Sequence, residues 1–393
     1  MNIRPPLQRG FSLIELLIGM AIGLVGLFAV SQIMLSFNKQ RGSINQTLAT
    51  QSNGVMALYL LERDISQAGY GMMNLQCPWI NYSYDGTGYY NTPYQSSTLP
   101  GAGNVALTAL PVRIHNNDGG LGNDIIEVQY GKTASGVPGA TITTAQTAYA
   151  DAYTVASTTG IADGDMFVTY SGSVCTLGQV SAAPTATTIP HVAGVSAYNV
   201  TTGAGGTGWN TVTSADLGLS PKPFVADMGN FVSRRFAVRS GALTLAELPS
   251  LNPAVTTPPN LVDDIIFLKA QYGLASSASS SAVATWASAD DLTTTPYDGT
   301  KAARVIAIRV GVVARSPLLE KEDVTTSTTL TVLPAVSGTS TTTPGNAGEC
   351  ATDATSKAVL CKVPDVTGGG AGSKYRYRAY STIIPLKNAI WTR

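Results

Sequence analysis

One apolar run dominates the N-terminal part of the chain. From Phe11 to Phe37 nearly every position is apolar, and Glu15 carries the only charge in the run. A helix of this length extends about 40 Å, which is enough to cross the ~30 Å hydrocarbon core of a bilayer. The pattern therefore predicts a helix over residues 11–37 that is long enough to span a membrane.

The helical pattern continues beyond this run. Apolar residues recur at three-, four- and seven-residue steps, as expected of an amphipathic helix. We therefore predict an amphipathic continuation over residues 38–70, with its apolar stripe packed on a globular domain. The sequence Gly69-Tyr70-Gly71 provides a stop signal, so the helix should end near Ala68. The recurring apolar positions are Ile44, Leu48, Val55, Leu58 and Ile65.

The rest of the chain has the alternation and β-branched enrichment of strands. Two low-complexity stretches, 275–289 and 325–343, are expected to be loops or irregular strand edges. The expected fold class is α+β, with a long N-terminal helix packed on a mostly antiparallel β-sheet head over residues 71–393. A large β-rich insertion is expected around residues 75–225. The clearest predicted strands are 123–130, 165–170, 230–239 and 304–315.

Composition excludes some classes of partner. Charged residues make up 12 % of the chain, and 24 basic residues balance 24 acidic ones. Nucleic-acid binding favours a basic patch or stripe, so we expect no nucleic-acid partner. The hydrophobic share of 44 % and the low charge also argue against a disordered chain.

The four cysteines suggest an exported, disulfide-bonded head. An even number of cysteines in an exported chain indicates two disulfides, and four cysteines allow three connectivities. Cys350 and Cys361 are close in sequence and would close a short loop, which leaves Cys77 to pair with Cys175. Four unpaired buried thiols are the alternative if the chain stays in a reducing compartment.

Three interpretations of the apolar run compete. A secretory signal peptide has a hydrophobic region of about 7–15 residues without charge, so this run is too long, although Ala29-Val30-Ser31 loosely fits a cleavage site. A plain membrane anchor leaves Glu15 unexplained, because a carboxylate costs about 2.5–3.5 kcal/mol at the centre of a span. The third interpretation is a leader that is cut before the apolar run.

The sequence RGFSLIELLIGMAIG, residues 9–23, resembles the type IV prepilin motif. The resemblance implies that residues 1–10 are a leader peptide and that prepilin peptidase cuts between Gly10 and Phe11 and methylates the new amine of Phe11. It also implies that Glu15 pairs with the N-terminal amine of a neighbouring subunit, which would compensate its buried charge. Alternatively, Glu15 only favours the positive N-terminus of the helix.

Glycines inside the run have two interpretations. Gly19 and Gly23 form a small-xxx-small pair that lets helices pack closely in lipid, or they are ordinary tolerated glycines of a membrane helix. The flanking basic residues are balanced on the two sides, so they do not set the orientation. The cysteines and the low-charge bulk of the chain favour a single-pass topology with the N-terminus in the cytoplasm and the head in the periplasm.

Later segments resemble the PilW family of minor pilins. This resemblance implies a minor pilin that primes type IV pilus assembly from the inner membrane. The subunit would then enter the filament at or near its tip and so reach the cell surface. Its partners would be other minor pilins, the major pilin, a PilY-type tip protein, prepilin peptidase and the inner-membrane assembly platform. The segments are LERDISQAGYG (61–71), LVDDIIFLKAQYG (261–273), ARVIAIRVGVVARS (303–316) and YRYRAYSTIIPLKN (375–388).

Two other functions stay open. A type II secretion pseudopilin has the same leader and helix. An adhesive tip subunit would bind a surface ligand through its head, and an aromatic-rich segment after Cys77 would then be the recognition surface or, equally, a packed lid. The aromatic residues are Trp79, Tyr82, Tyr84, Tyr89 and Tyr90.

The chain contains no recognisable catalytic motif. His115 and His191 are its only histidines, and no Ser-His-Asp, CxxC, HExxH or P-loop pattern is present. We therefore predict no enzyme, no catalytic residue and no cofactor. Asp and Asn near glycines would suit Ca²⁺, but such clusters are first of all turn formers, so we predict no metal site. These positions are Asp118, Asn123, Asp124, Asp163 and Asp165.

Overall fold

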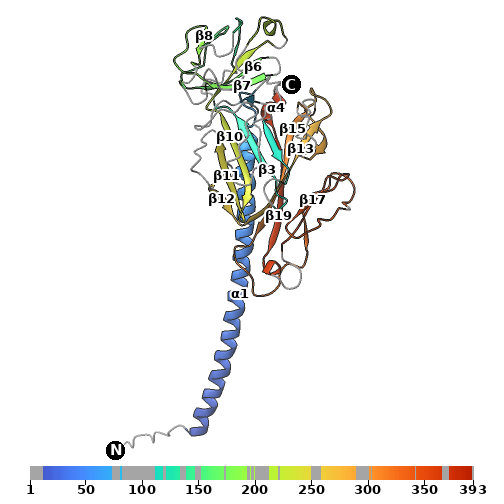
Figure 1. Cartoon of the computed structure of the whole chain (residues 1–393). Coiled ribbons are helices and arrows are strands. Elements are labelled where there is room, and N and C mark those ends of the chain that lie inside the picture. The colour runs from blue at the N-terminus through green and yellow to red at the C-terminus, as the bar shows by residue number, and fades with distance from the viewer. Residues whose placement is uncertain are drawn as a thin grey trace, which may run out of the picture. The chain divides into compact units, whose positions relative to one another are not determined.

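The computed structural model describes most of the chain. It divides into two compact units, Met1–Ala49 and Thr50–Arg393, and helix α1 (Leu13–Ile65) contributes residues to both (Figure 1). The described residues are 12–72, 80–81, 111–117, 121–132, 139–146, 152–171, 174–192, 195, 199, 212–219, 222–248, 258–288, 301, 303–340, 342–364 and 371–391.

Helix α1 has 53 residues, which corresponds to about 80 Å of helix. It ends at Ile65, three residues before the expected end, and a series of turns follows. Gly69 has φ +79° in these turns, a conformation that glycine adopts without strain, and its N–H donates to the carbonyl of Gln129 at 2.8 Å. The Gly-Tyr-Gly stop is therefore a turn that passes the chain from the helix into the sheets.

Five strands form the sheet that we call the front sheet. Its order is β12-β11-β10-β3-β2, and all neighbours are antiparallel. Its side chains alternate between a face toward α1 and a polar face, as strand geometry requires. The strands are β2 (Val112–His115), β3 (Ile125–Tyr130), β10 (Val232–Arg239), β11 (Ala242–Leu248) and β12 (Asn260–Asp263).

Four strands form a second sheet, the back sheet, with the antiparallel order β14-β13-β15-β19. Its two central strands are almost wholly buried, in agreement with their long β-branched runs. The strands are β13 (Ile265–Ala275), β14 (Val283–Ala287), β15 (Val305–Arg315) and β19 (Tyr377–Pro385).

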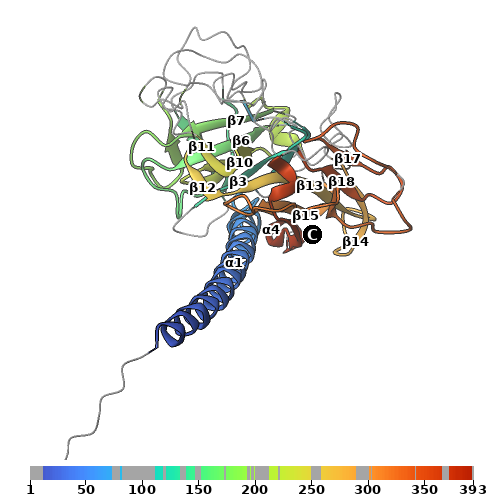
Figure 2. The ribbon, with the colours of Figure 1, turned by 90° about the horizontal axis from the view of Figure 1, so that it is seen from below.

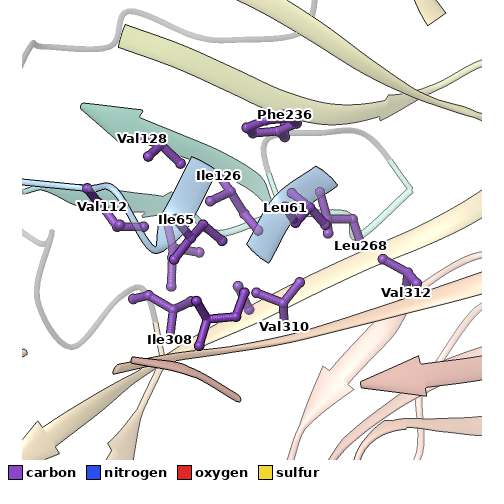
Figure 3. Close-up of a cluster of buried hydrophobic side chains, with 14 of the residues drawn as sticks. Leu61, Ile65, Val112, Ile126, Val128, Phe236, Leu268, Ile308, Val310 and Val312 are labelled. Atoms are coloured by element: carbon purple, nitrogen blue, oxygen red, sulfur yellow. The ribbon is translucent and has the colours of Figure 1, made fainter. Parts of the chain in front are cut away.

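The main core lies where α1 meets both sheets. Leu61 and Ile65 contact front-sheet residues such as Phe236 on one side and back-sheet residues such as Val310 on the other (Figure 3). The expected fold class, a long N-terminal helix packed on a mostly antiparallel β head, is therefore confirmed, with two sheets rather than one enclosing the helix. The sequence indicates the strands but not the turn that assigns them to two sheets. Asp264, at φ +60°, forms that turn between β12 and β13, and β13 belongs to the back sheet.

The predicted β-rich insertion is present, mostly between β3 and β10, with one strand, β1, that precedes β2 in the chain. It contains a five-stranded sheet of order β1-β7-β6-β9-β4, a two-stranded pair β5-β8, and a second hydrophobic core of its own around Tyr153 and Phe167. Among the described strands, β1 and β7 make the parallel pair. The elements are β1 (Ile80–Asn81), β4 (Ala140–Thr141), β5 (Ala152–Thr154), β6 (Met166–Ser171), β7 (Val174–Gln179), β8 (Thr188–Pro190), the short helix η1 (Asp216–Gly218) and β9 (Phe224–Gly229).

A small three-stranded sheet, which we call the disulfide sheet, covers part of the back sheet. Its order is β16-β18-β17, and Val332 and Leu333 pack on Phe267 and Val313. Seen from below, front-sheet strands β10 to β12 lie on one side and β15, β17 and β18 on the other (Figure 2). The remaining elements are β16 (Thr329–Leu333), β17 (Cys350–Thr352), β18 (Val359–Lys362), the short helix η2 (Ala371–Lys374) and α4 (Lys387–Trp391).

Both low-complexity stretches contain a strand at the edge of a sheet. β14 lies within 275–289 and β16 within 325–343, and each has only one neighbouring strand. Small and hydroxylated residues suit such positions because one side of an edge strand faces solvent.

Candidate functional site

The N-terminus of α1 is closed by its own side chains. The Ser12 N–H donates to Glu15 Oε2 at 2.9 Å, and the Ile14 N–H donates to Ser12 Oγ at 3.4 Å. Ser12 and Glu15 thus form a capping box, which satisfies N–H groups that a helix start leaves without partners. In the single subunit, Glu15 is a capping residue with an exposed carboxylate. Gly10 and Phe11, the predicted cleavage pair, lie outside the described residues.

The following surface of α1 is apolar all round and exposed. Every Leu, Ile, Val, Met and Phe from Leu13 to Phe37 is more than half exposed. By length and composition, α1 is the one helix among the described residues that is apolar enough to cross a membrane. Exposing this much apolar surface to water is unfavourable in free energy. The unfavourable free energy is removed only when lipid or other subunits cover the helix.

Gly19 and Gly23 lie on this exposed surface. A Cβ atom built on either glycine would meet nothing within 4 Å beyond the helix itself. Both positions are therefore open to close approach by another helix, which is what the small-xxx-small prediction requires.

The part of α1 inside the head packs through a different stripe from the predicted one. Ile44, Leu48 and Val55 are 58 %, 57 % and 60 % exposed, so their assignment to the buried stripe was wrong. The buried positions follow the same helical period but are mostly small or polar. They are Thr50, Gly54, Ala57, Leu61, Asp64, Ile65 and Ala68.

Gly54 marks the closest approach of a strand to the helix. A Cβ at this position would lie 2.3 Å from Cδ2 of Tyr380 in β19, closer than any real contact. Glycine is required here because the aromatic ring lies directly on the helix backbone.

A buried carboxylate ties α1 to the front sheet. Asp64 is 1 % exposed, and Arg234 of β10 donates from Nη1 to its Oδ2 at 3.1 Å and to its Oδ1 at 3.3 Å. The same Nη1 also donates to the Tyr130 hydroxyl at 3.2 Å. Burial alone would lower the pKa of Arg234, but Asp64, Tyr130 and Glu247 together outweigh it and raise that pKa. We call Asp64, Arg234 and Tyr130 the helix clamp.

A second buried cluster lies on the far face of the front sheet. Glu127 accepts hydrogen bonds from Ser233 Oγ at 3.0 Å and Gln129 Nε2 at 3.1 Å, and it lies 3.1 Å from His115 Nε2 and 3.3 Å from Arg235 Nε. Burial alone would raise the pKa of Glu127, but Arg235 and His115 hold it well below its usual value. Burial lowers the pKa of His115. The cluster thus holds an ionised carboxylate inside the fold.

The Asx residues that resembled cation ligands bind protein groups instead. Lys269 of β13 donates from Nζ to Asp124 Oδ1 at 2.5 Å, and the Ala270 N–H donates to Asp124 Oδ2 at 2.9 Å. Asn123 accepts from the Leu268 N–H at 2.7 Å and donates to the Ile266 carbonyl at 3.2 Å. The side chains of the loop before β3 therefore bridge the front sheet to the bulge in β13.

The other Asx positions are divided between a turn and residues without description. Asp165 accepts from the Ala162 N–H at 2.7 Å and so closes the turn that precedes β6. Asp118 lies outside the described residues. Among the described residues, no three His, Cys, Asp or Glu side chains gather as a metal site would require.

One predicted disulfide is present. Cys350 and Cys361 are bonded, and they face each other across β17 and β18. Cys77 lies outside the described residues, so its pairing with Cys175 stays a prediction. The backbone of β1 places Ile80, three residues after Cys77, opposite Cys175. The aromatic segment (Trp79, Tyr82, Tyr84, Tyr89, Tyr90) also lies outside the described residues.

Sequence reasoning missed the helix clamp and the role of Gly54. A usable signal existed for the clamp, since Asp64 is a charged residue at a position where the helical period predicts burial. Its partner Arg234 is 170 residues away, and a single sequence gives no indication of that pairing.

Comparison with known proteins identifies two regions. Residues 231–388 match the family described as Type IV Pilus-assembly protein W, and residues 6–31 match the prokaryotic N-terminal methylation motif. No curated protein matches the chain significantly. A solved type IV-like pilin from Thermus thermophilus is 16 % identical, over 41 % of this chain and 68 % of that one. Its TM-score of 0.22 is too low to support a conclusion about the fold.

The two family matches agree with the geometry of the parts that they cover. The methylation motif covers the capped, exposed apolar start of α1, and the family region runs from β10 to α4, including the clamp residue Arg234 and both central back-sheet strands. The C-terminal part of the chain, residues 231–388, is thus similar to the PilW family of type IV pilus assembly proteins, and the N-terminus carries a prepilin-type N-terminal methylation motif.

Proposed function

We propose that this protein is a minor pilin that is cut between Gly10 and Phe11, primes type IV pilus assembly at the inner membrane, and enters the filament at or near its tip. The observation that supports this most strongly is the methylation motif directly before a helix with an uncovered apolar surface. Such a surface is stable in lipid before assembly and against the helices of other subunits afterwards.

The two proposed environments use the same helix differently. In lipid, Glu15 closes its own helix by accepting from Ser12. In the filament, the methylated amine of a neighbouring Phe11 supplies the positive charge that a buried carboxylate needs. Other minor pilins, the major pilin, a PilY-type tip protein, prepilin peptidase and the assembly platform are the proposed partners.

The processing step is tested by mass spectrometry of the protein from cells. We expect an N-terminal peptide that starts at N-methylated Phe11. Gly10→Ala should leave the leader attached, while Gly42→Ala, at an exposed helix position with nothing within 4 Å, should leave processing unchanged. A wild-type N-terminus at Met1 or near Gln32 would contradict the proposal.

The tip position requires a separate test. The insertion with its own core adds bulk to the head between β3 and β10, which suits a subunit without close lateral neighbours. Immunogold labelling of purified pili should mark filament ends only. Label along the whole shaft would refute tip incorporation and leave processing untouched.

The role of Glu15 is tested by Glu15→Gln, which keeps a hydrogen-bond acceptor for the helix cap but removes the charge. We expect normal processing and normal folding of the head, with loss of the subunit from filaments. Ser12→Ala, which weakens only the cap, is the matched control and should still be incorporated.

A further inference from the structure

Strand β15 has two faces with different neighbours. Ile308 and Val310 point toward α1 in the main core (Figure 3). Because side chains alternate along a strand, Arg309 and Gly311 belong to the opposite face of the back sheet, which we call the outer face. The disulfide sheet covers the outer face at Gly311, where a Cβ would lie 2.7 Å from Cγ1 of Val332 in β16. Arg309 lies two residues before this contact and therefore next to the end of β16.

The guanidinium of Arg309 is buried among neutral groups, and the residue is only 5 % exposed. Nε donates to Gln271 Oε1 at 2.8 Å, Nη1 donates to the Pro334 carbonyl at 3.1 Å, and Nη2 donates to both Gln271 Oε1 and the Lys357 carbonyl. The guanidinium also lies over the ring of Trp286, with Cζ 5.0 Å from the ring centroid. An amide oxygen, two carbonyls and an aromatic ring thus surround the cation, and none of them carries a charge.

This environment differs from that of Arg234 in the helix clamp. Asp64 and Glu247 form ion pairs with Arg234, whereas no carboxylate in the described part of the chain does so with Arg309. Burial lowers the pKa of Arg309 to about 10, so the group remains protonated at neutral pH. A buried charge without a counter-ion is unfavourable, and an anionic partner would stabilise it.

One N–H group of Arg309 has no acceptor among the described residues. A guanidinium has five N–H groups. One on Nε, two on Nη2 and one on Nη1 donate in the bonds given above, so the remaining group is the second N–H of Nη1. Nη1 is the nitrogen bonded to Pro334, and both Pro334 and Arg309 line a cavity, whereas Gln271 and Lys357 are not among its lining residues.

The cavity has a volume of about 320 Å³. One water molecule takes up about 30 Å³ in the liquid, so the cavity is large enough for a small organic group. Its wall combines one cation with aliphatic side chains and two residues that bear hydroxyl groups. The lining residues are Arg309, Leu333, Pro334, Ser381, Thr382 and Ile383.

We propose that this cavity is a binding site for a carboxylate on a short aliphatic stem. The carboxylate accepts from the remaining N–H of Arg309 Nη1 and from the Ser381 hydroxyl, and the stem lies against Leu333 and Ile383. A single cation matches the single charge of a carboxylate, whereas a phosphate carries more acceptor oxygens and more charge than this wall can satisfy. A free short-chain acid and a glutamate side chain of another protein share this chemistry. The site is independent of the proposed role in pilus assembly.

The binding experiment uses trifluorobutyrate, a carboxylate on a short stem with a fluorine signal for NMR. The full chain is kept in detergent micelles, and micelles without protein correct for uptake of the probe. We expect the fluorine signal to broaden with the protein, and the neutral trifluorobutyramide to bind about tenfold more weakly, as the loss of one charged contact predicts. Equal binding of acid and amide would refute the role of the cation. Stronger displacement of the probe by inorganic phosphate than by butyrate would refute the assignment to a carboxylate.

A carboxylate can also be introduced into the cavity by substitution. Ser381 lies opposite Gly311, so it is a diagonal neighbour of Arg309 on the outer face. The position is exposed, so Ser381→Glu and its neutral control Ser381→Gln should both fold. We expect the melting temperature of Ser381→Glu to exceed that of Ser381→Gln by about 2 °C and its binding of trifluorobutyrate to be lost. Equal melting temperatures, or undiminished binding in Ser381→Glu, would refute the site.

A last comparison distinguishes the two sources of the carboxylate. N-acetylglutamate N-methylamide imitates a glutamate side chain within a protein, and the corresponding glutamine compound is its neutral control. Displacement of trifluorobutyrate by the glutamate compound alone would assign the site to a protein partner, and binding without such displacement would assign it to a free acid. Equal displacement by both compounds, or no binding of trifluorobutyrate to the unsubstituted chain, would overturn the proposal.

Discussion

The two parts of α1 differ in what covers them. From Leu13 to Phe37 the helix carries large apolar side chains on every side, and all of them are exposed. From Thr50 onward, the buried stripe combines small residues with Leu61, Ile65 and a carboxylate, and two sheets enclose it. One part is complete only in a membrane or an assembly, and the other is complete within its own head.

The difference follows from what each part contacts. Two sheets can approach a helix closely only where its side chains are small, as at Gly54 and Ala57, and tight packing then fixes the helix in one position. The apolar part needs no fixed partner, since lipid and other helices both cover large aliphatic side chains. Substitutions in the head part should therefore change the stability of the head, and substitutions in the apolar part should not.

Removal of the clamp carboxylate should have the largest effect. Asp64→Ala leaves Arg234, which is only 16 % exposed, without its main partner, and breaking a buried ion pair costs about 3–5 kcal/mol. Urea unfolding of the full chain in detergent would measure the loss. Glu62→Ala, at an exposed position in the same turn, should change the free energy of unfolding by less than about 0.5 kcal/mol. Equal effects of the two variants would contradict the clamp.

The same substitution in the two parts gives the most direct comparison. Leu61→Ala removes a fully buried side chain and should cost about 2–5 kcal/mol, because it leaves a cavity between the sheets. Leu24→Ala removes a side chain that is 70 % exposed and should leave the unfolding of the head unchanged. Thermal unfolding followed by near-UV circular dichroism would separate the two. A destabilised head in Leu24→Ala would contradict the claim that only the head part of α1 stabilises the head.

Glycine should also behave differently at a packed and at an open position of α1. Gly54→Ala places a Cβ against the Tyr380 ring, and overpacking of this kind costs about 1–3 kcal/mol, only partly offset by a gain of up to about 1 kcal/mol in helix preference. Gly42→Ala meets nothing and should retain that gain. Adding Tyr380→Leu to Gly54→Ala should recover stability in a double-mutant cycle, and the absence of coupling would argue against the contact.

The smallest expected effect is a dependence on pH from the far face of the front sheet. Burial lowers the pKa of His115 below its ordinary value of 6.5, so below about pH 6.5 the unfolded chain takes up a proton that the folded chain does not. Stability should therefore fall as the pH decreases. Near pH 4.5 and below, protonation of Glu127 in the unfolded chain should add to the loss, because its folded pKa is held low.

This dependence can be assigned to one residue. His115→Gln should flatten the change in melting temperature between pH 7 and about pH 5, and the steeper loss at lower pH should persist. An unchanged slope in that variant would show that another group is responsible.

The sequence predicted α1 and most strands correctly, because each of these features is a local pattern. The buried stripe was predicted wrongly for a physical reason. Ile44, Leu48 and Val55 look like core residues by hydrophobicity, but the sheets pack on Gly54 and Ala57 instead. Hydrophobicity identifies residues that avoid water, and it does not distinguish a side chain covered by its own fold from one covered by lipid or a neighbouring subunit.

Charged contacts at long range were also outside the reach of the sequence. Asn123 and Asp124 have the composition of a turn or a cation site, and only the fold brings Lys269 of β13 to them. The disulfide between Cys350 and Cys361 was predictable because its loop is short.

The C-terminal contact with α1 has a consequence for biosynthesis. Tyr380 and Asn388 belong to the last part of the chain, and they cover Gly54 and the carbonyls at the end of the first helix. The helix is thus completed by residues that follow it more than 300 positions later. A nascent chain cannot close this core until β19 has been synthesised, so a subunit truncated before β19 would leave the helix uncovered on that side and expose itself to proteolysis.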